Sequence, residues 1–146
     1  MIIIPDSNII ISALINENGT EFNLATNAPS AIQFATPSFL IDEVRSKIAK
    51  ISKLTQNSES DILANLETLL APFIILFEKD LANDSIDRAI KLVSTIDLKD
   101  ALFVAVTIHC NGILWTGDLK LLRGLRRKGF TQIITTKELV QIISGL

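Results

Sequence analysis

The sequence predicts an α/β fold: a three-layer α/β/α sandwich with a central parallel sheet of four to five short strands. Two observations predict it. Short apolar segments alternate along the chain with longer segments of helical pattern. The apolar segments are continuous and rich in isoleucine rather than alternating apolar with polar residues, which is typical of strands buried on both faces. Helices are therefore expected on both sides of the sheet.

The N-terminal elements follow from short signals. A strand is predicted over residues 2–4, where three isoleucines lead to Pro5. Asp6-Ser7-Asn8 then offers capping side chains to a helix over residues 9–14. A polar loop at 16–20 precedes a short helix over 21–28, and a second strand over 33–35 is closed by Pro37.

The middle of the chain changes period. After Ser38, apolar residues recur at helical spacing, which predicts one amphipathic helix with its charged residues off the apolar stripe. A second helix over 59–70 follows a polar segment at 56–58, and Pro72 ends it. Residues 73–77 form the third predicted strand. The apolar stripe of the first of these helices consists of Ile41, Val44, Ile48 and Ile51.

The C-terminal elements complete the alternation. Helices over 84–94 and 98–110 are separated by a break near residues 96–97, and the second is apolar on nearly all sides, which predicts a buried central helix. Gly112 ends it before a fourth strand over 113–115. A basic helix over 118–128 ends at Gly129, which suits a left-handed cap. A strand over 133–134 and a helix over 136–143 follow.

Composition limits the class of protein. The 146 residues fit one domain, residues 1–146, and 48% of them are hydrophobic. The net charge of −2 gives no global attraction to nucleic acid, so any such binding must come from local patches. The single cysteine excludes an internal disulfide, and no segment approaches the ~20 apolar residues that span a bilayer. We expect a soluble, cytoplasmic protein with no membrane partner.

Two predicted strands are followed by an aspartate, Asp6 in the first case and Asp118 in the second. In open parallel sheets, ligands bind outside the carboxyl ends of the strands, near a topological switch point. A single aspartate there is more simply a helix N-cap. Two of them, together with further acidic residues, favour a functional site.

Three further positions are candidates for that site. Asp97 and Asp100 share the first turn of the apolar helix; Asp97 suits an N-cap, whereas Asp100 lies further in, where a carboxylate is costly unless paired or bound to a cation. The other candidate is Glu43 or its neighbour Asp42, between which helical geometry does not choose. For either of these two, an ordinary solvated carboxylate is the alternative.

Several carboxylates in one cleft would raise one another's pKa unless a cation neutralised them. Oxygen ligands without a set of histidines or cysteines favour Mg²⁺ or Mn²⁺ over zinc. Such an ion lowers the pKa of a bound water and stabilises charge on a phosphate, so the pattern indicates phosphodiester hydrolysis.

The helix that follows Asp118 is unusually basic for an acidic chain. Its cations could complement the C-terminal helix dipole on a solvated face, or they could bind the backbone of a nucleic acid. A second basic cluster could extend such a binding surface, with weaker support. It consists of Arg45, Lys47, Lys50 and Lys53. The candidate RNA-binding residues of the basic helix are Lys120, Arg123, Arg126 and Arg127, with Lys128 beside them.

The order of four segments resembles a known family. It is Asp6-Ser7-Asn8 after a strand, Glu43-Val44 after Pro37, the run Asp97-Leu98-Lys99-Asp100-Ala101-Leu102-Phe103-Val104-Ala105, and Trp115-Thr116-Gly117-Asp118. Together they closely resemble a PIN domain over essentially the whole chain. The most specific part is the pairing of D-x-x-F-V-A with a later T-G-D.

That resemblance implies a site and a function. The quartet would be Asp6, Glu43, Asp100 and Asp118, binding Mg²⁺ or Mn²⁺ and cutting RNA to leave a 5′-phosphate and a 3′-hydroxyl. Asp97 is a further candidate ligand, and Asn8 and Thr116 match polar positions that support the carboxylates. Members of the family are most often VapC-type toxins of toxin–antitoxin modules, which implies an antitoxin partner and a homodimer.

Two other functions compete with a metal-dependent endoribonuclease. A receiver-type signalling domain also groups acids around Mg²⁺ at strand ends, but it needs a phosphoacceptor aspartate directly after the central strand, where this chain has Glu78-Lys79-Asp80. A catalytically silent PIN-like scaffold that binds RNA or a protein is the second alternative. The presence of all four acids counts against it.

Overall fold

Five short parallel strands form one sheet in the order β3-β2-β1-β4-β5 in the computed structural model, which describes residues 1–146. In the register, Ile3 of β1 lies opposite Phe34 of β2 on one side and Ile113 of β4 on the other. The chain adds strands on one side of β1 and then on the other, so the switch point lies between β1 and β4. The strands are β1 (Ile2–Pro5), β2 (Gln33–Pro37), β3 (Ile74–Leu76), β4 (Ile113–Trp115) and β5 (Ile133–Ile134).

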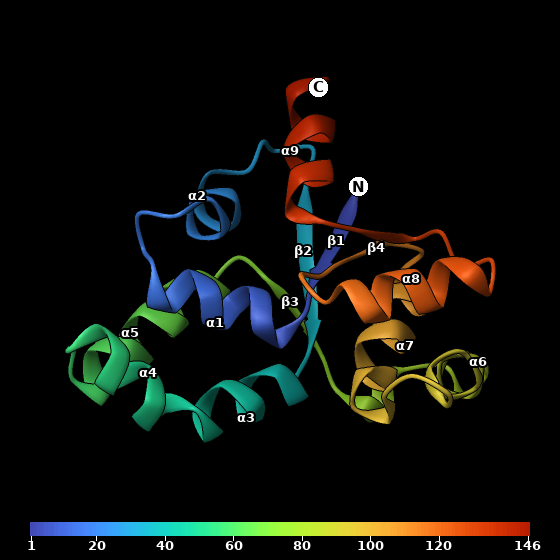
Figure 1. Cartoon of the computed structure of the whole chain (residues 1–146), viewed down its shortest axis with the longest axis horizontal. Helices are drawn as coiled ribbons and strands as arrows, with labels where there is room; N and C mark the ends of the chain where they lie inside the picture. Colours follow the sequence, from blue (N-terminus) through green and yellow to red (C-terminus); the bar gives the residue numbers. More distant parts are fainter.

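Helices cover both faces of this sheet, as the sequence predicts, and the result is a three-layer sandwich (Figure 1). One layer holds α1 (Ser7–Ile15), α2 (Thr20–Asn27), α3 (Phe39–Ser46), α4 (Ile48–Thr55) and α5 (Glu59–Leu70). The other holds η1 (Glu78–Asp80), α6 (Asn83–Val93), η2 (Leu98–Asp100), α7 (Ala101–Cys110) and α8 (Leu119–Arg127). No helix is both long enough and apolar enough to cross a membrane.

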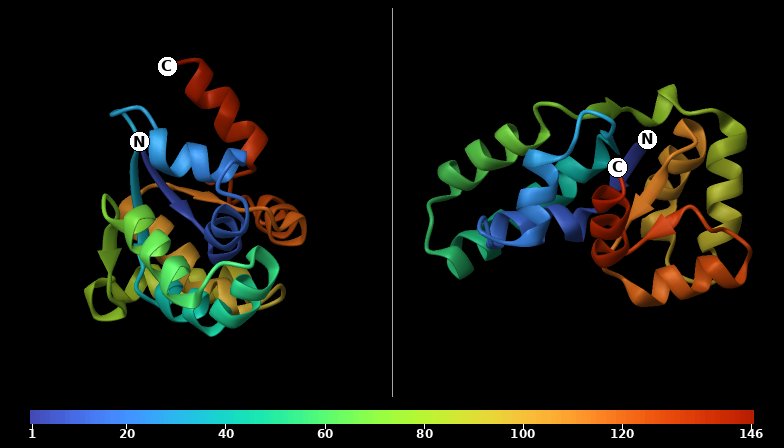
Figure 2. Two further views of the ribbon diagram at one scale, coloured as in Figure 1. Left: turned by 90° about the vertical axis from the view of Figure 1, so that its left-hand side faces the viewer. Right: turned by 90° about the horizontal axis from the view of Figure 1, so that it is seen from above.

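The last helix, α9 (Thr136–Ser144), projects beyond the end of the sheet and carries the C-terminus away from the body (Figure 2). Thr135 caps it by accepting a hydrogen bond from the backbone N–H of Glu138, whose side chain accepts one in return from the N–H of Thr135. Leu139 is buried, whereas Val140 is 38% and Leu146 63% exposed. The apolar side chains of this C-terminal segment are thus only partly covered.

The central strands are buried on both faces. Ile3, Ile4, Leu114 and Trp115 have no exposed surface. Full burial of an aliphatic side chain contributes about 1.5–3 kcal/mol, so β1 and β4 are the most firmly held part of the sheet. The indole Nε1 of Trp115 donates a hydrogen bond of 2.9 Å to Thr136 Oγ1, which satisfies its only polar atom. The two strands that carry Asp6 and Asp118 are therefore rigidly placed.

The single helix predicted after Ser38 is wrong: the chain forms two helices that meet at Lys47, where φ is −109° and ψ is 7°. Ser46 Oγ donates a 2.6 Å hydrogen bond to the backbone oxygen of Glu43, which favours a bend at this point. The bend lets α3 and α4 both pack against α1 and keeps Val44 and Ile51 buried. Tertiary packing has overridden the helical periodicity.

The apolar helix predicted over 98–110 also differs at its start. Residues Leu98–Asp100 form a 3₁₀ turn, η2, and Leu98 is 60% exposed. Asp97 caps this turn, since its Oδ1 accepts a 3.0 Å hydrogen bond from the backbone N–H of Lys99. The prediction of a buried central helix is confirmed for residues Phe103 to Thr107 of α7. This helix packs between the sheet and α6.

Candidate functional site

The site lies where the carboxyl ends of β1 and β4 meet, at the switch point of the sheet. The backbone N–H of Asp6 donates a 3.0 Å hydrogen bond to the carbonyl oxygen of Trp115, which continues the pairing of these strands by one residue. Asp6 is 4% exposed, and its Oδ1 caps α1 by accepting from the N–H of Ile9 at 3.0 Å. Asp6 therefore does cap a helix, but capping uses only one of its two carboxylate oxygens.

Thr116 connects the two aspartates that follow the strands. Its buried hydroxyl donates a hydrogen bond to Asp6 Oδ2 and accepts one of 3.0 Å from the backbone N–H of Asp118. Asp118 in turn caps α8, because its Oδ1 accepts from the N–H groups of Lys120 and Leu121 at 3.0 and 3.1 Å. Its Oδ2 carries no hydrogen bond, so one oxygen of Asp118 is available to a ligand.

Glu43 reaches the same place from α3. The hydroxyl of Ser7, which is buried at the start of α1, donates a 3.0 Å hydrogen bond to Glu43 Oε1. Asp42 is exposed and lies outside the cleft that Glu43 lines. Of the two acids that helical geometry left open, Glu43 is therefore the one that lines the cleft.

Asp100 and Asp97 complete the acidic wall. Asp100 is half-buried at the junction of η2 and α7 and makes no side-chain hydrogen bond, whereas the exposed Asp97 is engaged in capping η2. Both side chains line the cleft. The structure thus gives Asp97 the capping role that the sequence suggested, while leaving it beside the other acids.

These side chains enclose one polar cavity of about 200 Å³, which we call the carboxylate cleft. Asn8, predicted to support the carboxylates, lines it with an exposed side chain. Four of its residues were not predicted as parts of the site: Ser7, Lys47, Lys99 and Phe103. Ser7 was signalled by its place beside Asp6, and Lys47 faces the cleft only because of the bend between α3 and α4. The cleft is lined by Asp6, Ser7, Asn8, Glu43, Lys47, Asp97, Lys99, Asp100, Phe103 and Asp118.

Burial and mutual repulsion shift the pKa of two acids upward. Burial raises the pKa of Asp6 to about 6, with a further rise from the charge of Asp118, against the lowering effect of the hydrogen bonds from Thr116 and Ile9. The pKa of Asp100 rises to about 7, first through burial and then through the negative charges of Asp97, Asp6, Asp118 and Glu43. The four quartet acids therefore interact electrostatically, and positive charge in the cleft would stabilise them.

The chemistry of this donor set fits a hard divalent cation, because the cleft offers carboxylate, amide and hydroxyl oxygens and no histidine or cysteine. The acids line the cleft without converging: no three acidic, histidine or cysteine side chains are arranged as a ready ligand set. The residues that would hold such a cation are Asp6, Glu43, Asp100 and Asp118, all of which line the cleft.

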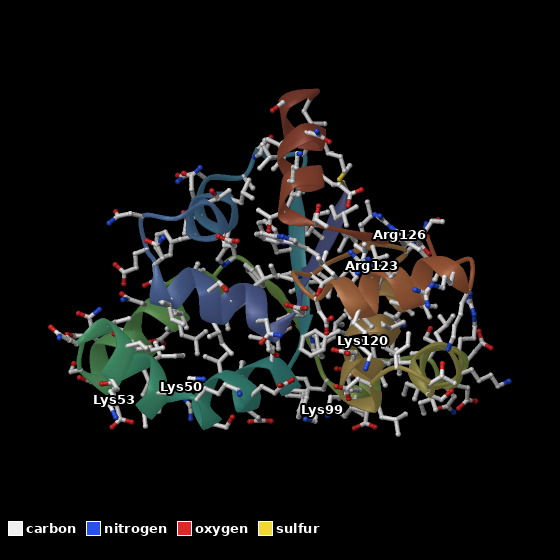
Figure 3. The ribbon with its side chains drawn as sticks, viewed as in Figure 1. Lys50, Lys53, Lys99, Lys120, Arg123 and Arg126 are labelled. Atoms are coloured by element: carbon white, nitrogen blue, oxygen red, sulfur yellow. The ribbon has the colours of Figure 1, made fainter.

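The basic residues predicted to bind RNA separate into two groups. Lys120, Arg123 and Arg127 are exposed on α8 and form no ion pair (Figure 3 labels the first two). Arg126 is engaged within the protein: its guanidinium donates to both oxygens of Glu138 at 2.9 Å and to the carbonyl of Ile133 at 3.0 Å. These contacts tie α8 to β5 and α9.

The second basic cluster does not continue the first. Lys50 and Lys53 lie on α4, on the far side of the molecule from Lys120 and Arg123, with Lys99 between the two groups (Figure 3). The carboxylate cleft lies between the two groups, and one member of the second cluster, Lys47, lines it. Lys47 and Lys99, which line the cleft, are its nearest cations.

Comparison with known proteins agrees with this fold. The family model described as PIN domain matches residues 4–140, and the chain belongs to the PIN domain family. No curated protein matches the sequence. The structure of PAE2754 from Pyrobaculum aerophilum superposes with a TM-score of 0.68 at 15% identity, covering 99% of this chain and 96% of that one.

A second solved structure is VapBC2 from Rickettsia felis, bound to a DNA fragment from its promoter. It matches with a TM-score of 0.59 at 21% identity, covering 92% of this chain and 97% of that one. At these identities the two structures show the fold. The receiver alternative is excluded by the same fold, since receivers have the strand order 2-1-3-4-5 rather than the order seen here.

Proposed function

We propose that this protein is an Mg²⁺- or Mn²⁺-dependent endoribonuclease. The observation that carries the proposal is the carboxylate cleft, where acids from four separate segments line one cavity at the switch point of a PIN fold. Burial and neighbouring negative charges raise the pKa of two of them, Asp6 and Asp100. PIN domains are generally nucleases and usually use divalent metals. The proposed metal ligands are Asp6, Glu43, Asp100 and Asp118, with Asp97 at the rim.

When bound, the cation supplies a water of lowered pKa and positive charge beside the scissile phosphate. Residues of the chain position the acids and supply further positive charge. Thr116 holds Asp6 and the backbone of Asp118 in register, and Ser7 holds Glu43. Lys47 and Lys99 place positive charge at the mouth of the cleft, where an RNA phosphate must enter. The expected products carry a 5′-phosphate and a 3′-hydroxyl.

The proposal includes a role as the toxin of a toxin–antitoxin module, with an antitoxin as protein partner. Its support is the fold shared with VapBC2, together with membership of the PIN family. A homodimer is also proposed, since Val140 on the projecting α9 and Leu146 just beyond it leave apolar surface exposed. Sedimentation of the purified protein would test the dimer, and growth arrest on expression, relieved by a co-expressed neighbouring gene product, would test the toxin.

The decisive experiment is cleavage of a mixed pool of end-labelled RNAs by wild type and Asp6→Asn, with Mn²⁺, with Mg²⁺ and with EDTA. Metal-dependent cutting by the wild type alone is the expected result. Metal binding without cutting of any RNA would favour the silent scaffold instead. Absence of both binding and cutting would remove the metal site from the proposal altogether.

A further inference from the structure

A second polar cavity, of about 370 Å³, lies beside the carboxylate cleft, and we call it the cationic pocket. Lys120, Arg123 and Arg127 of α8 form one wall, since positions three and four apart share a helix face. Thr95 and Ile96, in the turn after α6, form the other. No acidic residue lines it. In a chain with a net charge of −2, such a concentration of unpaired cations indicates an anionic ligand.

The turn that forms the opposite wall is fixed to α8 by Lys128. The ammonium of Lys128 donates hydrogen bonds to the carbonyl oxygen of Leu92 at 2.6 Å and to Thr95 Oγ1 at 2.7 Å. Because Thr95 Oγ1 accepts from Lys128, its own hydroxyl hydrogen is left to donate to a ligand. The pocket therefore combines three free cationic side chains with a positioned neutral donor.

Gly124 allows the two walls to approach. A Cβ atom at this position would lie 2.5 Å from Ile96 Cδ1 and 3.0 Å from its Cγ1. Glycine is unfavourable inside a helix, so its place in the middle of α8 is explained by this close contact. The side chain of Ile96 therefore lies directly against the backbone of α8 where it lines the pocket.

The cationic pocket continues the carboxylate cleft along both walls. Ile96 precedes Asp97, which lines the cleft, and Lys120 follows Asp118 by two residues. A strand that leaves the cleft between Asp97 and Asp118 thus meets the cationic pocket next. The volume equals that of about a dozen water molecules, which is enough for a phosphate and part of its sugar.

We infer that the cationic pocket binds one internal phosphodiester of the RNA strand, at a fixed number of nucleotides from the bond that is cut. The inference rests on the proposed function, because it takes RNA as the ligand. It differs from diffuse attraction to a basic helix in one respect: a single phosphate position should contribute more to the binding affinity than its neighbours do.

The test measures binding in EDTA, so that it does not depend on cleavage. Single-stranded oligoribonucleotides carry one uncharged methylphosphonate at successive positions, and their affinity is compared for wild type, Arg123→Ala/Arg127→Ala and Arg88→Ala/Lys91→Ala. The last variant removes the same charge from exposed positions on α6, outside the pocket. Circular dichroism checks that all three are folded.

We expect one methylphosphonate position to weaken binding by wild type and by the α6 variant about tenfold, and to have no effect on Arg123→Ala/Arg127→Ala. The slope of log affinity against log salt should fall in magnitude by about 0.7 in that variant, the value for one phosphate contact with a single strand. Equal losses at every position would overturn the inference, as would a preference for a 5′-terminal phosphate that the pocket variant loses.

Failure of the two proposals can be distinguished. If RNA binds with one sensitive phosphate but is never cut with metal present, the pocket stands and the nuclease proposal fails. If RNA is cut but no position is sensitive, the nuclease stands and the pocket assignment fails.

Discussion

The hydroxyl of Thr116 donates a hydrogen bond to Oδ2 of Asp6, across a sequence separation of 110 residues, and so joins the ends of β1 and β4 at the candidate site. The hydroxyl oxygen of Thr116 also accepts a hydrogen bond from the backbone N–H of Asp118. One side chain thereby sets the relative position of the two acids that follow the central strands. Its replacement offers a direct test of the site.

Thr116→Val should destabilise the fold by about 1–3 kcal/mol, because it leaves a buried carboxylate and an N–H group without their partner. The hydrogen bond from Thr116 lowers the pKa of Asp6, so its loss should raise that pKa further and move the onset of Mn²⁺ binding to higher pH. Calorimetric titration of Mn²⁺ between pH 5 and 8 measures the shift. Thr116→Ser keeps the hydroxyl and should behave as wild type; an equal shift in both variants would contradict this role.

Asp118→Asn should separate folding from activity. Asparagine caps helices about as well as aspartate, so α8 should stay intact and Tm should change little. The loss of a negative ligand should slow RNA cleavage by roughly a hundredfold or more, the effect of removing one strong electrostatic interaction from a catalytic site. Cleavage rates and thermal melts of the same preparation decide the matter. Full activity would show that Asp118 is a cap only.

The stability of the metal-free protein should fall as pH rises from about 4 to about 7. Asp100 and Asp6 have folded-state pKa values of about 7 and about 6, above the ordinary value of 3.8, so the folded state binds their protons more tightly than the unfolded state does. The stabilisation is complete below pH 4 and is lost as pH rises through these folded values. Thermal melts in EDTA across this range measure the decline.

A divalent metal should reverse that dependence, since it binds the deprotonated acids of the folded state and stabilises them by mass action. The rise in Tm on adding Mn²⁺ should therefore be larger at pH 8 than at pH 5.5. Asp100→Asn provides the control, because it removes the group with the higher pKa. It should flatten the profile in EDTA and reduce the response to Mn²⁺; an unchanged profile would count against the shift assigned to Asp100.

Ser7→Ala should release Glu43 without disturbing the core. Ser7 holds Glu43 Oε1 at 3.0 Å, and polar groups that orient metal ligands typically matter by about 10–100-fold in affinity or activity. For Ser7→Ala we expect both kcat and the affinity for Mn²⁺ to fall by about tenfold, the lower end of that range. Ser7→Thr retains a hydroxyl and serves as the matched variant. Glu43→Gln should cause the larger loss, and the reverse order would contradict the arrangement.

Arg126 and Arg123 should respond in opposite ways to alanine substitution. Arg126 is engaged with Glu138 and Ile133, so Arg126→Ala should lower stability by roughly 0.2–1 kcal/mol, as for a partly exposed ion pair, and leave RNA affinity nearly unchanged. Arg123→Ala should weaken RNA binding and leave stability unchanged. Urea unfolding and filter binding compare the two. Equal losses of RNA affinity would restore Arg126 to the RNA-binding group.

Local signals in the sequence were sufficient for much of the fold. The isoleucine run before Pro5 predicted β1, and Asp6 and Asp118 were placed after the correct strands, where both cap helices. Gly129, with φ of 84°, confirms the predicted left-handed end of α8. These features depend on a few consecutive residues, so they can be predicted from the local sequence.

Features that depend on distant segments could not be predicted in the same way. The bend at Lys47 results from packing of α3 and α4 on α1, and nothing in the local periodicity marks it. Helical periodicity left Glu43 and Asp42 open, and only the resemblance to the PIN family named Glu43, which accepts a hydrogen bond from Ser7. The ion pair of Arg126 depends on Glu138 in another helix.

The sequence by itself therefore determined the kinds of element, their order, and the acids that follow the strands, because hydrophobic period and capping act over one or two turns of chain. Tertiary structure decided which acids share the carboxylate cleft and which cations stay free to form the cationic pocket. The physical reason is that side chains meet across the sheet only after the crossovers have fixed the strand order, and that order is a property of the whole chain.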